Sequence, residues 1–418
     1  MNKNTIAETF AGAGGSHLGF INNGFVSVYI NEFEPNCIQT LKLNFPLLEK
    51  KCYIDPRDIN DISINKISII NVDVLFGGIV CKGFSLAGQR KPTDKRNYLY
   101  LKQLEFVNHL KPTISIIENV PTFLTTKILK KELIPQFEKE IDDIWQEYAQ
   151  LQAKKGSKRK KNLSHELENK RLLELKNLKN DLLKKLEKQQ VLISVFDDIK
   201  NKYDKMGYKV YHQVLNSAWY GAATARNRAI IVAVKKEIKK IFTFPKITHF
   251  QKDNPLGNIN GMSFCDNLLP YTTVEDVFKT IDYNNLDDLD NIPMSHNPKT
   301  IKRFGFIPEG KNISHIIDQL PNELKISSFY SRGSATRLSR HKPCGTLVPG
   351  HSALPIHPWL NRSITIREAA ALSGFPLNYK FYGSHSNRCE QIGNAVPILL
   401  SNAIAKKIKK FLKEVKSE

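Results

Sequence analysis

The sequence lacks a long hydrophobic run. Nowhere in its 418 residues do about 18 uncharged apolar residues follow one another, which excludes a membrane-spanning helix. Residues 1–12 also lack the apolar core of a signal peptide. We therefore expect a soluble intracellular protein, and a hydrophobic content of 41% is enough to fill the cores of two or three domains.

Paired cysteines are absent as well. The six cysteines stand singly and far apart in the chain, at Cys37, Cys52, Cys81, Cys265, Cys344 and Cys389. Without a CxxC motif or a cluster of cysteine and histidine, neither a disulfide framework nor a zinc site is expected. A single cysteine can instead serve as a nucleophile.

Acidic residues are scarce relative to basic ones. The chain has 41 Asp and Glu against 62 Lys and Arg, a formal net charge of +21. Such an excess favours a polyanionic partner, nucleic acid first, because Lys and Arg release condensed counterions when they neutralise phosphates. A lysine-rich proteome would produce the same balance, so charge alone leaves both interpretations open.

Short apolar runs alternate with helix-like stretches over much of the chain. Strands are expected at 5–10, 26–31, 72–76, 114–118, 208–214 and 229–234. Helices are expected at 98–109, 365–375 and 397–413. The alternation is typical of an α/β fold with helices on both faces of a sheet.

Two long amphipathic helices interrupt this pattern. Apolar residues recur at helical spacing over 137–151 and again over 172–186, which predicts an inserted helical hairpin at about 131–205. Its tip, residues 154–161, holds six basic residues in eight. We interpret the tip as reaching DNA beside the target site, with a solvated turn that binds nothing as the alternative.

The pattern changes again after residue 240. Residues 241–362 are irregular and rich in Asn, Pro, Gly and aromatics, which indicates a smaller domain of loops and short strands. We therefore predict a first domain over 1–240, a second over 241–362 and a C-terminal segment over 363–418. The last part of that segment, about 388–418, is expected to pack back on the first domain.

A glycine-rich turn follows the first strand. Residues 11–16 read Ala-Gly-Ala-Gly-Gly-Ser, and glycines there let a ligand approach the backbone at the carboxyl end of the strand. His17 stands where a dinucleotide fingerprint has its third glycine, which argues against NAD and FAD. Glu32, twenty residues after Gly12, is placed to hold a ribose diol. A nucleoside ligand without a pyrophosphate fits both observations.

Further reactive side chains stand at other strand ends. Cys81 follows a strand in a loop punctuated by glycines, which makes it a candidate nucleophile. Glu118 ends another strand and so lies on the same rim of the sheet. Arg226 and Arg228 occupy alternate positions, which places both on one face of an extended segment.

These segments resemble, in order along the chain, the motifs of the DNA (cytosine-5)-methyltransferases. The matching segments are residues 10–15, 77–85, 118–120, 226–228, 367–376 and 391–397. The resemblance covers roughly residues 5–125, 207–234 and 363–405.

The resemblance implies a Rossmann-like methyltransferase sheet that binds S-adenosylmethionine, yields S-adenosylhomocysteine and needs no metal. It places around this cofactor Phe10, Gly12, Ala13, Gly14, Gly15, Glu32, Phe33, Asp58, Ile59, Val80, Leu99, Asn394 and Ala395. Glu32 would hold the ribose, and Asp58 with Ile59 would contact the adenine.

A reaction at cytosine is implied too. The Cys81 thiolate would add to C6 of a cytosine flipped out of duplex DNA, and Glu118 would act at N3. Arg226 would stabilise the O2 side of the ring and orient Glu118, with Arg228 as its helper. The methyl group would then pass to C5.

DNA contacts follow from the same resemblance and from the clustering of basic residues. The loop over 85–96 would close over the flipped base, and 241–362 would read the target sequence. The expected contacts are Ser85, Gln89, Arg90, Lys91, Arg96, Arg332, Arg337, Arg340 and Thr346. For each arginine, recognition of a guanine and contact with a phosphate alone both remain open.

The expected setting is bacterial. The resemblance implies a monomeric, sequence-specific enzyme of a restriction–modification system, acting on double-stranded DNA in the cytoplasm, at the nucleoid, and on no membrane. A cognate restriction endonuclease would recognise the same site.

The motifs depart from the family pattern at three places. Val80 replaces a proline before the nucleophile, Lys82 replaces a glutamine, and Ala223-Thr224 replaces Pro-Gln in the arginine motif. A DNA-binding homologue with little or no catalysis is therefore one alternative. An RNA (tRNA) cytosine-5 methyltransferase is another, although the roughly 110-residue variable region favours reading of a duplex.

Overall fold

The structure is a computed structural model that describes residues 3–79, 91–161, 163–285, 287–326, 335–350 and 354–417. The chain forms two compact units. The first comprises Met1–Gly78, Phe106–Glu118 and Tyr211–Glu418, and the second comprises Ile79–Glu105 and Asn119–Val210. The domain boundaries expected near 240 and 362 stay predictions.

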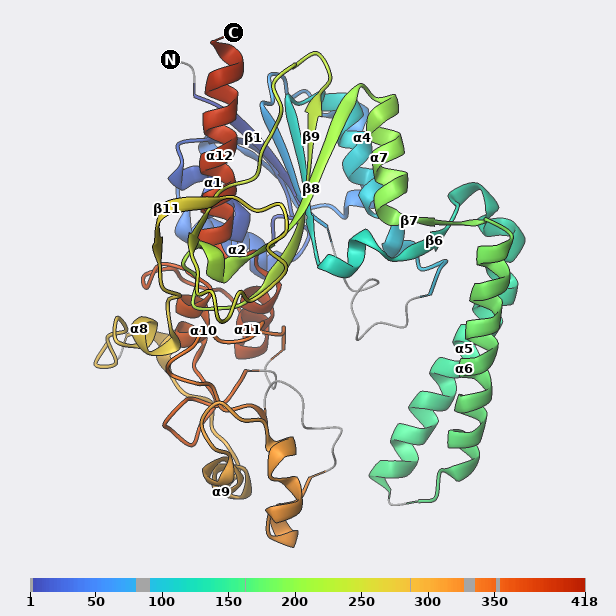
Figure 1. Ribbon diagram of the computed structural model, residues 1–418, viewed down its shortest axis with the longest axis vertical. Coiled ribbons are helices and arrows are strands. Elements are labelled where there is room, and N and C mark those ends of the chain that lie inside the picture. Colours follow the sequence, from blue (N-terminus) through green and yellow to red (C-terminus); the bar gives the residue numbers. More distant parts are fainter. Residues whose placement is uncertain are drawn as a thin grey trace. The chain divides into compact units, whose positions relative to one another are not determined.

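A seven-stranded sheet organises the first unit, in the order β3-β2-β1-β4-β5-β9-β8 (Figure 1). Its strands are β1 (Thr5–Thr9), β2 (Val26–Asn31), β3 (Tyr53–Asp55), β4 (Val74–Gly78), β5 (Ile114–Asn119), β8 (Tyr208–Asn216) and β9 (Asn227–Lys235). β1 pairs in parallel with both β2 and β4, so the strand order reverses at β1. Ligands of open α/β sheets bind outside the carboxyl ends of the strands at such a point.

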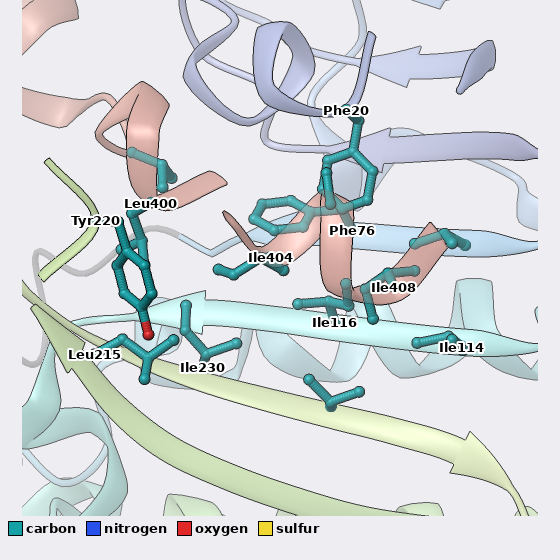
Figure 2. Packing of buried hydrophobic residues seen from close by; sticks show 14 of the residues in the cluster. Phe20, Phe76, Ile114, Ile116, Leu215, Tyr220, Ile230, Leu400, Ile404 and Ile408 are labelled. Atoms are coloured by element: carbon teal, nitrogen blue, oxygen red, sulfur yellow. The ribbon is translucent and has the colours of Figure 1, made fainter. Parts of the chain in front are cut away.

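Helices cover both faces of this sheet. On one face, α1 (Gly15–Asn22) and α12 (Ile398–Lys416) pack on alternate residues of the strands, because side chains two apart share a face. Figure 2 shows Phe20 and Ile404 meeting Phe76 and Ile116 in this core. On the other face, Phe106 of α4 (Tyr100–Leu110) contacts Tyr29, with ring centroids 5.6 Å apart. The predicted α/β fold is confirmed.

The second unit contains the helical hairpin. The two predicted helices are confirmed as α5 (Ile134–Lys160) and α6 (Glu166–Lys188), and Ile141, Trp145 and Leu186 are buried between them. The antiparallel strands β6 (Lys127–Leu129) and β7 (Leu192–Ser194) close its base, and α7 (Val195–Lys205) follows.

At the hairpin tip, the buried carboxylate of Glu168 lies 2.7 Å from Lys158 Nζ and 3.6 Å from Lys154 Nζ. Two of the tip lysines are therefore compensated inside the hairpin. The contact of this tip with DNA stays a prediction.

The region after residue 240 is irregular, as expected. It holds the short elements β10 (Ile247–His249), β11 (Phe264–Leu269), α8 (Val274–Phe278) and α9 (Pro298–Phe306). The helices predicted at 365–375 and 397–413 are confirmed as α10 (Ile366–Leu372) and α12. Periodicity did not indicate α2 (Pro35–Asn44), α3 (Leu48–Lys51) or α11 (His385–Asn394). Among the described residues, no helix has the length and apolarity that a membrane span needs.

Candidate active site

The glycine loop leaves β1 in a sequence of left-handed residues. Phe10, Gly12 and Gly14 have φ of 54°, 57° and 83°, and only glycine adopts such angles without steric cost. Strain at the non-glycine Phe10 is typical of a ligand site. Beneath the loop, His17 Nδ1 lies 2.5 Å from Glu8 Oε2, and both side chains are fully buried. This pair fastens the first turn of α1 to β1.

Glu32 shapes the outer side of the loop. Its carboxylate accepts hydrogen bonds from the backbone N–H groups of Gly12 at 2.7 Å and Glu34 at 2.8 Å. Burial raises the pKa of the Glu32 carboxyl, and these N–H groups oppose the shift. The next side chain, Phe33, is 54% exposed, although aromatic rings are usually buried. A carboxylate beside an exposed ring suits a nucleoside, as the sequence predicted.

The inner side of the loop packs against the end of α11. A Cβ on Gly15 would lie 2.5 Å from Val396 O and 3.3 Å from Ala395 Cβ. Asn394 ends α11, so two cofactor residues predicted from distant motifs, Asn394 and Ala395, do lie beside the glycine loop. By contrast, a Cβ on Gly12 would meet no atom within 4 Å, which marks open space where a ligand can approach.

Alanine substitutions at Gly15 and Gly12 should therefore have different effects. Gly15→Ala must displace the backbone at Val396, so we expect a lower melting temperature. Gly12→Ala pays only the left-handed cost of about 1 kcal/mol but intrudes on the ligand space, so we expect weaker S-adenosylmethionine binding with nearly native melting. Calorimetric titration and thermal unfolding of both variants measure the two effects. Equal losses of affinity with equal melting temperatures would contradict this assignment.

The adenine-contacting pair predicted at Asp58 and Ile59 lies just beyond β3. The Asp58 carboxylate accepts from the Asn60 N–H at 2.8 Å and caps a short 3-10 turn, while Ile59 is buried. Buried Asp55 at the end of β3 was not predicted, and it pairs with Arg57 at 2.6 Å. Contact of Asp58 and Ile59 with the cofactor stays a prediction.

Glu118 lies at the carboxyl end of β5 and is buried. Its Oε1 lies 2.6 Å from Arg228 Nε, and a Cβ on Gly78 of β4 would lie 3.9 Å from its Oε2. Burial raises the pKa of this carboxyl, against the opposing charges of Arg228 and Arg226. A buried carboxyl with a raised pKa is suited to give a proton to a substrate.

The two arginines divide their roles differently from the prediction. Arg228, not Arg226, contacts Glu118, so the assignment of Arg226 as the residue that orients Glu118 is wrong. Arg226 Nη1 donates to Leu347 O at 3.1 Å and to Gly393 O at 2.7 Å. Arg226 thus joins the segment before Val348 to the end of α11.

Residues 344–347 run beside the arginine motif. Ala225 N–H donates to Cys344 O at 2.7 Å, and Thr346 Oγ1 donates to Ala225 O at 3.3 Å. A Cβ on Gly393 would lie only 2.4 Å from Pro349 Cα, so the two backbones touch at that glycine. Thr346, predicted to contact DNA, therefore lies next to the arginine motif.

Arg337 is a structural residue. Its guanidinium is buried and donates at 2.6–2.9 Å to the carbonyls of Phe304, Ile307, His357 and Leu360 and to Asn361 Oδ1. All five N–H groups are used, so none is available for a base or phosphate. We correct the prediction that Arg337 binds DNA.

Arg337→Met should destabilise the region after residue 240 strongly. It leaves several buried carbonyls without donors, and each costs about 1–3 kcal/mol, so we expect a loss of at least about 3 kcal/mol. Urea unfolding followed by tryptophan fluorescence measures the shift. Arg340→Met is the control, since Arg340 is partly exposed and should have little effect. Equal midpoints for the two variants would contradict the structural role.

Other predicted DNA contacts are already engaged in ion pairs. Arg340 pairs with Glu309 at 2.9 Å and lies over the ring of Trp359. Within the second unit, Lys91 pairs with Asp142 at 2.5 Å, and Arg96 with Asp94 at 2.6 Å. Leu99 lies there too, between the turn at 95–98 and α4. Six predicted residues lie outside the described ones: Val80, Cys81, Ser85, Gln89, Arg90 and Arg332.

Four of the remaining cysteines are poor nucleophiles. Burial raises the thiol pKa of Cys52 and Cys344 to about 12 and that of Cys389 to about 11, and it raises that of Cys37 as well. These thiols stay protonated at neutral pH. Within the part of the chain that the structure describes, no group of three His, Cys, Asp or Glu side chains could hold a metal ion.

Known proteins resemble this chain over nearly its whole length. A family model described as C-5 cytosine-specific DNA methylase matches residues 4–149 and 167–410. The type II methyltransferase M.DdeI of Desulfomicrobium norvegicum is 25% identical over 98% of this chain and 89% of that protein. M1.HphI of Haemophilus parahaemolyticus is 26% identical over 97% of this chain and 87% of that protein.

Among solved structures, the Entamoeba histolytica methyltransferase EhMeth has a similar fold. Its TM-score is 0.56 at 13% identity, and the match covers 99% of both chains. Residues 150–166, which include the tip of the hairpin, lie outside the family match.

Proposed function

Because this chain belongs to the C-5 cytosine-specific DNA methylase family, we propose that it methylates C5 of a cytosine flipped out of duplex DNA through a covalent adduct with Cys81. The observation that carries the mechanism is the buried Glu118 with its raised pKa, ion-paired to Arg228 at the rim where the glycine loop ends. The motif order and the type II relatives support the family assignment.

S-adenosylmethionine fits the glycine loop. The Glu32 carboxylate can accept from the ribose hydroxyls, Phe33 presents an exposed ring, and Gly12 leaves its outer side open. Asn394 and Ala395 border the loop from α11. When bound there, S-adenosylmethionine supplies an electrophilic methyl group.

The chain's own residues activate the cytosine. The Cys81 thiolate forms a bond to C6, and the electron pair of the C5–C6 double bond moves toward the ring, where Glu118 supplies a proton at N3. Arg228 fixes Glu118 and stabilises the negative charge that develops on the O2 side. After C5 has gained the methyl group, its proton leaves, the Sγ–C6 bond breaks and the thiolate returns.

The proposal extends to the setting of the reaction. Type II relatives favour a sequence-specific, monomeric modification enzyme of a bacterial restriction–modification system, acting in the cytoplasm at the nucleoid, with an endonuclease that cuts the same unmethylated site. Residues 241–362 would read that site, with Thr346 and Arg340 among the contacts.

Methylation mapping tests this function. Genomic DNA from cells with and without the protein is sequenced after bisulfite treatment, and purified protein is assayed on duplex DNA and on tRNA. We expect 5-methylcytosine at one recurring DNA sequence. Transfer to tRNA alone would identify an RNA methyltransferase, and DNA binding without transfer would identify a non-catalytic homologue.

A further inference from the structure

A lysine-rich surface lies away from the active site, and we call it the distal lysine face. It is formed by residues 235–246 and by the exposed side of α12. These two segments contain eleven lysines and only two acidic residues, Glu237 and Glu414. The methyltransferase mechanism uses none of them.

On α12, lysine occupies every exposed position between 406 and 416. These residues are Lys406, Lys409, Lys410, Lys413 and Lys416. The spacing of three and four places them on one side of the helix, along roughly 15 Å at 1.5 Å per residue. The opposite side is buried in the core, so the helix cannot turn its lysines away.

Residues 235–246 lie beside this helix. Phe242 and Phe411 are in ring contact at 5.5 Å, and Lys407 Nζ donates to Thr243 Oγ1 at 2.6 Å. Burial lowers the pKa of Lys407, and the neighbouring charge of Lys410 adds to that effect. The two segments therefore form one continuous surface.

The surface continues into a hollow of about 630 Å³ at the amino ends of the strands. Lys3, Lys111, Lys235 and Lys416 line it, and Figure 1 shows α12 reaching this end of the sheet. Its carboxylate, Asp73, accepts from Thr5 N at 2.8 Å and pairs with Lys416 at 2.9 Å. The active-site rim is at the other end of the same strands, roughly 17–20 Å away for strands of five to six residues.

We propose that the distal lysine face binds the backbone phosphates of a second segment of duplex DNA. The inference rests on the proposed function, which supplies DNA as the substrate. Lysine offers a compact point charge without the planar fork that reads bases, so this surface fits phosphates irrespective of sequence. Bound there, long DNA stays close to the enzyme between successive methyl transfers.

A trapped complex tests the second site while the first is filled. Native protein is linked through Cys81 to a short duplex that carries 5-fluorocytosine at the mapped target, and a second, labelled duplex is then titrated. We expect binding with a Kd on the order of 10⁻⁶–10⁻⁴ M at physiological salt. If no trapped complex forms, the proposed mechanism fails, and the stoichiometry of short duplexes on the free protein then decides the second site alone.

Matched variants assign the binding to this surface. One carries Lys406, Lys409, Lys410 and Lys413→Gln, and the control carries Lys50, Lys51, Lys200 and Lys205→Gln, exposed lysines of α3 and α7 with the same charge change. On long DNA, we expect the first to flatten the slope of log Kd against log salt by about 3, at about 0.9 per phosphate contact, and the control to leave it unchanged. Both should methylate a short duplex at the native rate.

Two results would overturn the proposal. Equal second-duplex binding by native protein and the α12 variant would show that the lysines bind no DNA. Stronger competition by polyglutamate than by duplex would identify an acidic protein as the partner instead.

Discussion

Replacing Cys81 with serine should lower methyl transfer to duplex DNA by roughly 10⁴-fold or more, the scale at which loss of a nucleophile acts. A hydroxyl group is almost never ionised at neutral pH, so it cannot add to C6 as a thiolate does. The rate is measured with labelled S-adenosylmethionine and a duplex that carries the mapped target. Cys265→Ser, at a partly exposed thiol of β11, is the matched control and should keep the native rate.

The same variant gives a direct chemical test. Native protein should form a denaturation-resistant complex with DNA that carries 5-fluorocytosine, because the fluorine at C5 cannot leave as a proton does. Cys81→Ser should form none. A complex that persists in this variant would mean that another group attacks C6. The thiols of Cys52, Cys344 and Cys389 are unsuited to that role, since burial raises the pKa of each to about 11 or 12.

Glu118→Gln should lower kcat by about 10²- to 10⁴-fold, the usual contribution of a general acid. Glutamine keeps the size of the side chain and can still donate a hydrogen bond, but it cannot transfer a proton to N3. Binding of S-adenosylmethionine should change little, because Glu32 and the glycine loop form that site. Glu105→Gln, at an exposed carboxylate of α4, is the control and should leave kcat unchanged.

The pH profile separates a proton donor from a structural residue. Burial raises the pKa of Glu118, so its protonated form persists to higher pH than in an exposed glutamate. Native kcat/KM should therefore fall as pH rises through this raised pKa, and Glu118→Gln should lose that limb. A variant that keeps the same limb would show that another group controls it.

Arg226 links the two sides of the site. It holds both Leu347, in the segment that carries Thr346, and Gly393, one residue before Asn394. Val396 then touches the cofactor loop at Gly15. The segment expected to contact DNA and the loop expected to contact the cofactor are thus connected through a single guanidinium and one short stretch of backbone.

Some features followed from local sequence. The glycine turn could be read because left-handed backbone demands glycine, and Glu118 because it ends an apolar run. The hairpin helices could be read from their apolar spacing. By contrast, nothing near Arg337 distinguishes it from Arg340, because its five acceptors come from residues up to 33 positions away.

The sequence by itself determined the fold class, the family, and the order of the reactive residues, because motifs and apolar periods are local properties of the chain. The tertiary structure decided which partner each charged group has. It placed Arg228 on Glu118, sent Arg226 to carbonyls 121 and 167 residues away, and buried Arg337 among loops. It also gathered the lysines of α12 and 235–246 on one surface. Such pairings depend on distances between remote segments, and only the packing of the chain sets those distances.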